Sequence, residues 1–294
     1  MIDEPSTPVP PAAVLDAFGV RGVPVPLTGG QGRSVRVGAF VLKPAEGPED
    51  ESEWGTALME RLASGRDGAS GPGPASSGGF RVPRPLRAAD GRGVVDGWTA
   101  AEFLDGQPGP HGHWDGVLRA GRAFHAALRD LPRPGFLARR THPWAVADRA
   151  AWGEQDVGVV EELSGAYAAL CALRRPVRQD GAQLVHGDLT GNVLFAAGAE
   201  PAVIDFSPYW RPPAFAEAVV VADGLLWFGL RPGEPAGAGA VPDWQQMLVR
   251  ALIFRLVAHS ESAGPTRHAQ PGEPERYARA IDAVRAIAPA AGAA

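Results

Sequence analysis

The sequence predicts an α+β protein in which a small strand-rich lobe precedes a larger helical lobe. Its first third alternates short apolar runs with glycine and proline turns, which is typical of strands and hairpins. Its second half carries apolar side chains at every third or fourth position, which is typical of helices packed on a core. The predicted boundaries are 1–101 for the first lobe, 102–106 for a hinge and 107–294 for the second lobe.

The first lobe is predicted to contain a glycine-rich hairpin and an amphipathic helix. Residues 24–44, PVPLTGGQGRSVRVGAFVLKP, form a glycine turn followed by two short alternating strands. Trp54, Leu58 and Leu62 then recur at near-helical spacing behind an acidic first turn. The segment 64–79 has almost no apolar content, so we expect a flexible surface loop there. The predicted elements besides the hairpin are helices at 12–19 and 51–63 and strands at 80–86 and 92–98.

The second lobe is predicted to be a set of core-facing helices interrupted by a β-hairpin. Apolar side chains from Trp114 to Leu128, and again from Val160 to Leu173, repeat at intervals of three and four. Between 184 and 206, short apolar runs separated by polar turns replace this pattern, which indicates strands. Three further helices are predicted at 213–230, 242–260 and 274–288.

Composition and charge argue against two classes of protein. The net charge is −5 over 294 residues and no basic block runs along the chain, so we expect no nucleic-acid partner. No stretch of apolar residues is long enough for a membrane span, and the acidic, proline-rich start differs from a signal peptide. The single cysteine, Cys171, fits a reducing compartment. The sequence therefore predicts a soluble, cytoplasmic protein.

Besides the single cysteine, two residue types occur only once, and both occurrences lie in chemically informative positions. Arginine has replaced lysine throughout the chain except at Lys43, and the only asparagine is Asn192. A chain that prefers arginine keeps a lysine where a compact ammonium is needed in place of a planar guanidinium. An ordinary lysine at the end of a strand is the alternative interpretation of Lys43.

The strongest chemical motif lies in the predicted hairpin of the second lobe. In LVHGDLTGNVLF, an apolar strand leads to His186 and Asp188 and the loop ends at Asn192, while AVIDFS places Asp205 at the end of a later strand. Phosphoryl transfer needs such a set, because one carboxylate accepts the proton of the acceptor hydroxyl and hard oxygen ligands hold Mg²⁺ on the phosphates. The alternative is that Asp188 and Asn192 only stabilise turns.

These motifs resemble the catalytic loop and metal-binding aspartate of the aminoglycoside phosphotransferase and choline kinase superfamily, small-molecule relatives of protein kinases. The resemblance implies a bilobal protein-kinase-like fold that uses ATP and Mg²⁺. It implies Asp188 as catalytic base, His186 as a brace for the loop, and Asn192 and Asp205 as metal ligands. The segment after Asp205, DFSPYWRPPAFAEAVVVAD, resembles an actinobacterial branch of the superfamily. Asn192 follows Asp188 by four residues where the family usually has five, so the loop is one residue shorter.

The first lobe offers residues for the nucleotide phosphates. Gly29, Gly30 and Gly32 precede a strand, and backbone amides in such a turn can approach phosphate oxygens, although a glycine hairpin without a ligand is equally possible. The resemblance places Lys43 on the α- and β-phosphates. We expect an acidic side chain from the helix at 51–63 to position this lysine, and we choose Glu53 over Glu60.

The adenine and the acceptor have weaker signals. The connector containing Glu102 and Leu104 resembles the hinge whose backbone binds adenine, although any extended linker has a similar sequence. The acceptor is expected to be a hydroxyl-bearing small molecule. Candidate polar or aromatic residues for its pocket are Tyr209, Trp210, Glu217, Asp223, Trp227, Arg255 and His259, most of which could equally be core residues.

Three functions remain open from the sequence. The first is transfer of the ATP γ-phosphoryl group to a small-molecule hydroxyl. The second is a kinase-like nucleotide-binding module that has lost transfer, which the shortened loop allows. The third is a metal-dependent hydrolase that uses the same carboxylates, against which the glycine turn and Lys43 argue. An aminoglycoside acceptor is not favoured, because the last three predicted helices carry no dense run of acidic residues.

Overall fold

The structure is a computed structural model that describes 8–27, 32–64, 79–179, 181–231, 233–234, 241, 243–262 and 268–287. The chain forms two compact units. The first unit is residues 1–108 together with 194–205, and the second is residues 109–193 together with 206–294. The sequence places a hinge at 102–106, whereas the first unit continues to Pro108 and includes a segment from the middle of the chain.

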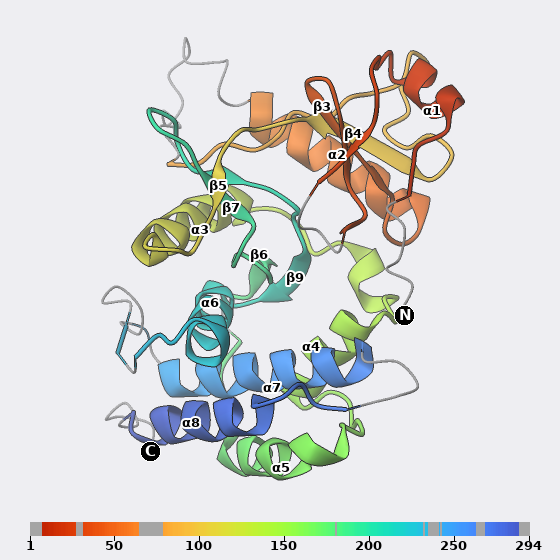
Figure 1. Cartoon of the computed structure of the whole chain (residues 1–294). Coiled ribbons are helices and arrows are strands. Elements are labelled where there is room, and N and C mark those ends of the chain that lie inside the picture. The colour runs from red at the N-terminus through yellow and green to blue at the C-terminus, as the bar shows by residue number, and fades with distance from the viewer. Residues whose placement is uncertain are drawn as a thin grey trace. The chain divides into compact units, whose positions relative to one another are not determined.

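The first unit is organised around an antiparallel sheet with strand order β1-β2-β3-β4 (Figure 1). The pairing of β3 with β4 is fixed by registers such as Lys43 opposite Thr99. Val14 and Phe18 of the region around α1 pack with strand residues such as Leu42 in one buried cluster. The elements of this sheet and its covering helix are α1 (Ala12–Ala17), β1 (Val25–Pro26), β2 (Val35–Val37), β3 (Phe40–Pro44) and β4 (Trp98–Glu102).

Helix α2 (Glu49–Ser64) agrees with the prediction of an amphipathic helix over 51–63. Acidic residues fill its first turn and Arg61 lies in its last turn, which complements the helix dipole at both ends. Its Glu53 carboxylate accepts hydrogen bonds from the backbone N–H groups of Gly93 and Val94, at 2.6 and 3.0 Å. These bonds attach the helix to the loop that precedes β4.

The predicted strands at 80–86 and 92–98 are wrong. Arg81, Pro85 and Val95 make only isolated bridges, and the regular strand is β4, which begins at Trp98. Proline lacks the N–H that a strand ladder needs, and this segment contains two prolines before Leu86. Asp96 and Gly97 both have positive φ, so a tight turn precedes β4. The predicted loop at 64–79 lies almost wholly outside the described residues.

A second, three-stranded sheet lies at the end of the first unit, with order β5-β7-β8. Gln107 pairs with Phe195 and Pro108 with Leu194 in antiparallel register. The sheet thus joins the end of the first long segment of the unit to its inserted segment, 194–205. The sequence predicts the strands between 184 and 206 as a hairpin of the second lobe, whereas β7 and β8 are neighbours in this sheet and residues 194–205 belong to the first unit. The strands of this sheet are β5 (Gln107–Pro108), β7 (Val193–Phe195) and β8 (Ala202–Val203).

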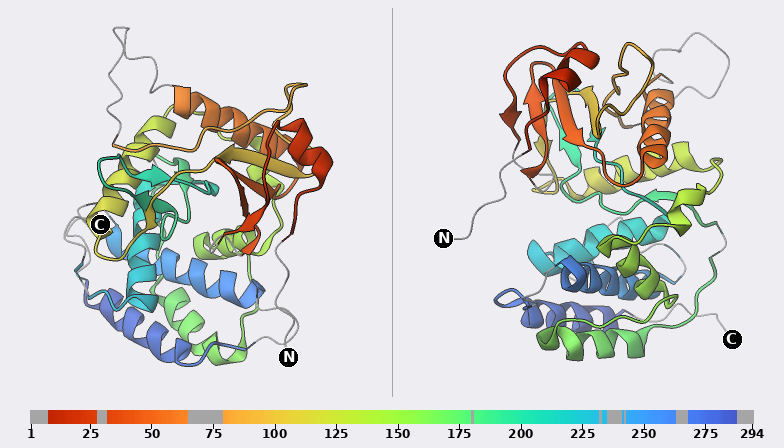
Figure 2. Two further views of the ribbon diagram at one scale, coloured as in Figure 1. Left: turned by 45° about the horizontal axis from the view of Figure 1, so that its top comes forward. Right: turned by 90° about the vertical axis from the view of Figure 1, so that its right-hand side faces the viewer.

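The second unit is mainly helical, and its core is built around one buried helix, α7 (Trp244–Ser262). Residues on every side of α7 are buried, and α4, α5, α6 and α8 all contact it. In the right-hand view of Figure 2, α6, α7 and α8 lie one below another, coloured from cyan to dark blue. A helix that is buried on all sides belongs to the centre of a core. The other helices are α3 (Trp114–Leu128), α4 (Pro143–Trp152), α5 (Ser164–Leu173), α6 (Pro213–Trp227) and α8 (Glu273–Arg285). Two short 3₁₀ turns cover Gly135–Ala138 and Glu161–Leu163.

Two elements of the second unit were not predicted. Helix α4 starts with Pro143 at its first turn, and the ring of His142 accepts a hydrogen bond from the Ala145 N–H, so the start has an N-cap. Strand β9 (Pro208–Arg211) pairs antiparallel with β6 (Gln183–His186). This pair carries the loop described next. Within the described part of the chain, no helix has both the length and the apolar character that a membrane span requires.

Candidate active site

The loop that carries the strongest sequence motif follows β6 and is fixed at its start by β9. Val185 pairs with Tyr209 in the β6–β9 register, and the Gly187 N–H donates to the Ser207 carbonyl at 3.0 Å. A Cβ at Gly187 would overlap the ring of Tyr209, which is itself buried. The glycine of the HGD motif therefore allows the loop to pass directly against the core.

We predict that Gly187→Ala destabilises the chain by about 1–3 kcal/mol, because the new methyl group must displace the Tyr209 ring from a packed core. Thermal or urea unfolding measures the loss. Gly165→Ala is the matched control, since Gly165 lies on the surface of α5 with open space around its Cα. Equal stability of the two variants would contradict the proposed packing.

Asp188 lies at the centre of a hydrogen-bond network within this loop. Its Oδ1 accepts a hydrogen bond from Arg255 Nη2 at 2.7 Å. The Asn192 Nδ2 donates to the Asp188 backbone carbonyl at 2.7 Å and to its Oδ2 at 3.2 Å. The carboxylate is thus held through both oxygens, and it remains accessible because the side chain of Asp188 stays 44% exposed. The shortened loop still brings Asn192 into contact with Asp188.

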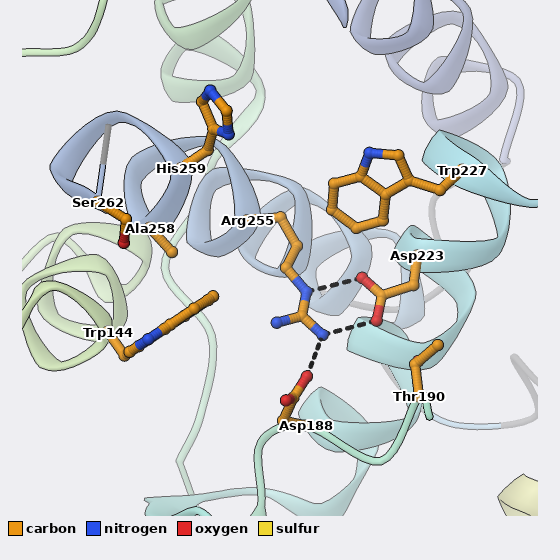
Figure 3. Close-up of a pocket in the computed structure, with 9 residues that line it drawn as sticks. All are labelled: Trp144, Asp188, Thr190, Asp223, Trp227, Arg255, Ala258, His259 and Ser262. Carbon is orange, nitrogen blue, oxygen red and sulfur yellow. Dashed lines mark hydrogen bonds and ion pairs between the residues drawn. The ribbon is translucent and has the colours of Figure 1, made fainter. Parts of the chain in front are cut away.

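Arg255 of α7 is held by two carboxylates at once (Figure 3). Its Nε and Nη2 donate to the two oxygens of Asp223 on α6, at 2.7 and 2.6 Å, in addition to the bond to Asp188. Both Arg255 and Asp223 are buried. Burial alone would lower the pKa of Arg255, but the charges of Asp223 and Asp188 raise it above its ordinary value, so the guanidinium remains charged.

His186 contributes to the loop through its backbone and ring. Its ring Nδ1 accepts the Asp188 N–H at 3.1 Å, and its own N–H donates to Nε2 of His125 at 3.0 Å. Both histidines are buried. The sequence assigns His186 a bracing role and overlooks His125, whose position on α3 shows only helical periodicity. Burial and the neighbouring His186 lower the pKa of His125 to about 3.

His125 gives stability a specific pH dependence. Its pKa falls from 6.5 in the unfolded chain to about 3 in the folded chain, so between these values the unfolded chain binds a proton that the folded chain does not. Stability is therefore expected to fall as the pH decreases from 6.5 towards 3, by up to about 1.4 kcal/mol per pH unit. Thermal unfolding of wild type and His125→Gln across this range measures the effect.

The glutamine variant keeps an acceptor for the His186 N–H but cannot be protonated, so its acid-side decline is expected to be shallower. His268→Gln is the control, because the side chain of His268 is 77% exposed. The same acid-side slope for His125→Gln and wild type would show that His125 does not cause the decline.

A pocket opens beside Asp188 within the second unit. Its volume is about 360 Å³, which lies within the range of small-molecule sites, about 300–1,000 Å³. Figure 3 shows that α4 contributes Trp144, α6 contributes Trp227 and α7 contributes His259 to its wall, together with Arg255. Four of the residues that the sequence offers for an acceptor pocket line it: Asp223, Trp227, Arg255 and His259.

The other three acceptor candidates do not line this pocket. Tyr209 is a buried core residue that packs edge-on against Phe254. Glu217 pairs with Arg122 through two hydrogen bonds. Trp210 lies on β9 and is half-buried.

In the first unit, Lys43 and Asp205 form an ion pair. Lys43 Nζ lies 2.7 Å from Asp205 Oδ1, and both side chains are about one-third exposed, at 39% and 34%. Burial alone would lower the pKa of Lys43, but the Asp205 carboxylate outweighs it and the pKa is raised. Asp205 has φ of 49°, an uncommon conformation for a residue with a side chain. The sequence predicts a phosphate ligand and a metal ligand here, and the structure brings them into contact.

Glu53 does not pair with Lys43, contrary to the sequence-based prediction. One of its oxygens lies 3.2 Å from Arg87 Nη1, and the other accepts the two backbone N–H groups described above. Glu60 also bonds to Arg87, through both of its oxygens at 2.7 Å. The helix acids are thus used to hold the loop before β4, and Asp205 is the partner of Lys43.

The structure places the other candidate nucleotide residues as follows. Gly32 has φ of +67°, with open space around its Cα, whereas Gly29 and Gly30 lie outside the described residues. Glu102 is the last residue of β4, and its backbone N–H donates to the Arg84 carbonyl at 2.8 Å. Leu104 follows, and its backbone N–H has no hydrogen-bond partner among the residues described.

Asn192 in the second unit and Asp205 in the first unit each keep an oxygen atom of the kind that a hard divalent cation prefers. Because Nδ2 of Asn192 donates to Asp188, its Oδ1 is left to act as a ligand, and Asp205 keeps Oδ2 beyond its bond to Lys43. Carboxylate and amide oxygens are the ligands that Mg²⁺ prefers, usually with substrate phosphates completing the shell. In the described ranges, no group of three or more histidine, cysteine, aspartate or glutamate side chains could hold a metal by itself.

Sequence reasoning missed two features of the site. Arg255 is one of the acceptor candidates from the sequence, but its bond to Asp188 was missed, because that bond spans 67 positions. Trp144 lies in the unpredicted helix α4. The one signal for Arg255 is the cost of burying a charge, which requires a carboxylate partner for an arginine inside an apolar helix.

Neither a protein-family model nor a curated protein matches the sequence. Solved structures do match the fold. An aminoglycoside phosphotransferase from Alicyclobacillus acidocaldarius is 14% identical, with 97% of this chain and 96% of that chain covered and a TM-score of 0.57. A choline kinase from Streptococcus pneumoniae is 8% identical, with 94% and 97% covered and a TM-score of 0.60. An amicoumacin kinase in complex with AMP-PNP and Ca²⁺ is 15% identical, with 92% of each chain covered and a TM-score of 0.53.

These likenesses show the fold. The chain has the kinase-like α+β fold of these phosphotransferases, with a small antiparallel sheet in one part and mostly helices in the other. The predicted fold class is therefore confirmed.

Proposed function

We propose that this chain transfers the γ-phosphoryl group of ATP to a hydroxyl group of a small molecule. The observation that carries the proposal is the environment of Asp188. Its carboxylate is fixed on one side by Arg255 and Asn192 and on the other side forms part of the wall of a pocket of small-molecule size. A hydroxyl compound in that pocket lies within reach of a positioned base.

Asp188 has the geometry of a base that aligns an acceptor. Arg255 holds Oδ1, so Oδ2 accepts the proton of the acceptor hydroxyl as the new P–O bond forms and the bond to the β-phosphate oxygen breaks. ADP leaves with the electron pair of that bond. The buried ion pair of Arg255 with Asp223 prevents the Asp188 carboxylate from rotating, which pre-organises the base.

Lys43 and Asp205 are proposed to bind the nucleotide and its metal ion. The Lys43 ammonium binds the α- and β-phosphates, exchanging its contact with Asp205 for phosphate oxygens. Asp205 and Asn192 hold Mg²⁺, which neutralises phosphate charge when bound. The glycine turn around Gly32 and the backbone at Glu102 and Leu104 are the proposed contacts for phosphate and adenine. The AMP-PNP and Ca²⁺ in the similar amicoumacin kinase are in keeping with this proposal.

A nucleotide-binding module without transfer is the second candidate, and the short catalytic loop is what favours it. Against it, Asn192 still contacts both the backbone and the side chain of Asp188. The loop therefore closes with one residue fewer than is usual in the resembling family.

The test is to incubate the chain with ATP, Mg²⁺ and a panel of hydroxyl compounds, and to quantify ADP and phosphorylated acceptor in the same samples. Equal amounts of the two products are expected for at least one acceptor. A rise in melting temperature with ATP but no acceptor-dependent ADP would identify the binding module. ATP loss without a phosphorylated product would identify a hydrolase.

A further inference from the structure

The pocket beside Asp188 lies wholly within the second unit, and its charges indicate which acceptors it can hold. Resting on the proposed function, we infer that the acceptor is an uncharged, hydroxyl-bearing ring compound such as a neutral sugar, and that Arg255 excludes cationic acceptors. The three observations behind this inference are the pairing of the acidic groups, the position of the guanidinium against Trp144, and the two indoles in the wall.

Every carboxylate at the pocket already has a partner inside the protein. Both oxygens of Asp223 accept hydrogen bonds from Arg255, and Asp188 Oδ1 accepts a third. The buried Glu273 faces His259 at 3.4 Å and accepts the backbone N–H of Gln270 at 2.8 Å. A cationic acceptor that leaves water needs a carboxylate of its own, because desolvating an unpaired charge is costly. The Asp188 Oδ2 that remains is the proposed base.

The Arg255 guanidinium lies over the Trp144 indole, where a cationic acceptor would otherwise stack. Its guanidinium carbon lies 5.9 Å from the centre of the Trp144 ring, within the range of a cation–π contact. An ammonium or quaternary nitrogen stacked on the same indole would lie close to a like charge, and like charges repel. The indole therefore does not indicate a cationic ligand here.

An anionic acceptor is also disfavoured. Asp188 and Asp223 bring two negative charges to the wall and Arg255 brings one positive charge, so the triad is net negative. A negatively charged acceptor would add to that charge. The same net charge by itself attracts a cation, so the preference for an uncharged ligand over a cationic one rests on the pairing of the carboxylates and on the position of Arg255.

The wall suits a neutral ring with hydroxyl groups. Trp144 and Trp227 lie on either side of the Arg255 guanidinium in the view of Figure 3, and each offers an apolar indole surface for the C–H face of a ring. Arg255 Nη1 has no hydrogen-bond partner among the described residues, so it can donate to a ligand hydroxyl. Few polar groups in an otherwise apolar wall are what small-molecule sites use to orient a ligand.

The test uses ligand pairs that differ in charge at one position. The pairs are D-glucose with D-glucosamine, and 3,3-dimethylbutan-1-ol with choline, and calorimetric titration of the full chain measures their affinities. The neutral member of each pair is expected to bind at least about tenfold more tightly, which corresponds to about 1.4 kcal/mol. Equal or tighter binding of the charged members overturns the inference, and so does binding of none of the four compounds.

Arg255→Gln tests whether the charge of Arg255 causes the preference for neutral ligands. The glutamine amide can still donate to Asp223 but carries no charge, so choline and glucosamine are expected to gain affinity relative to their neutral partners. Arg122→Gln is the matched control, since Arg122 pairs with Glu217, which is not part of the pocket wall. An unchanged preference in a folded Arg255→Gln variant overturns the role of Arg255. If that variant does not fold, the wild-type comparison decides.

The same ligands separate this inference from the proposed function. If neutral ligands bind preferentially but no phosphorylated product forms with ATP, the proposed transfer fails while the ligand class stands. If phosphoryl transfer occurs but glucosamine or choline is the better acceptor, the transfer stands and the ligand class fails.

Discussion

Asp188→Asn is expected to lower kcat for phosphoryl transfer by about 10²–10⁴, the usual contribution of a positioned general base. The asparagine keeps an oxygen that can accept the Arg255 hydrogen bond, so the loop should hold its shape, but it cannot take a proton. Steady-state kinetics with the best acceptor of the panel measures the effect. KM for ATP is expected to change little, because the assigned nucleotide contacts are elsewhere.

Asp282→Asn is the control, since Asp282 is a largely exposed aspartate on α8. Its kcat should match that of wild type. Full activity of Asp188→Asn with an unchanged melting temperature would remove Asp188 from the chemistry and leave the pocket as a binding site.

Asp205→Asn is expected to cause the other large loss, about 10²–10³ in kcat/KM, because in the proposed function the variant loses the charge that would hold Mg²⁺. The same change removes the partner of Lys43. Burial then becomes the main influence on the lysine, so its pKa should fall from its raised value. Kinetics at increasing Mg²⁺ concentration measure the first effect, since saturation should require more metal.

Glu53→Gln provides the contrast for Asp205→Asn. Glu53 is bonded to Arg87 and to the loop before β4, so its loss is expected to lower the melting temperature while kcat stays near wild type. If Glu53→Gln instead reduces kcat as strongly as Asp205→Asn, a lysine–helix-acid pair forms during turnover and the contacts in this structure describe a resting arrangement.

The sequence predicts the parts of the site that depend on short motifs. The order His186, Asp188, Asn192 and Asp205 along two strands and their loops is visible in the sequence, and the lysine that contacts Asp205 is the only one in the chain. The apolar repeat from Trp114 to Leu128 has the same ends as α3, whereas α5 begins at Ser164, four residues after the start of its repeat at Val160. In these cases the residues that form the element or loop lie close together in the chain, so the local sequence is enough to predict it.

The parts that sequence reasoning misses depend on contacts distant in the chain. Which acid of α2 faces which arginine depends on how the helix is rotated against the loop before β4, and Arg87 is 34 positions from Glu53. The hydrogen bonds of Arg255 connect α7 to Asp223 on α6 and to Asp188 in the loop after β6. Between 80 and 97, prolines and a positive-φ turn prevent the strands that the apolar pattern indicates.

The composition of the first unit from two separate stretches of chain affects how the protein can be dissected. A fragment that ends at Pro108 lacks the strands β7 and β8 and the partner of its only lysine. A fragment that starts at Gly109 carries those strands without β5, against which β7 pairs. No single cut therefore separates the units, and a genetic fusion that joins 1–108 to 194–205 through a linker would carry the whole first unit in one product.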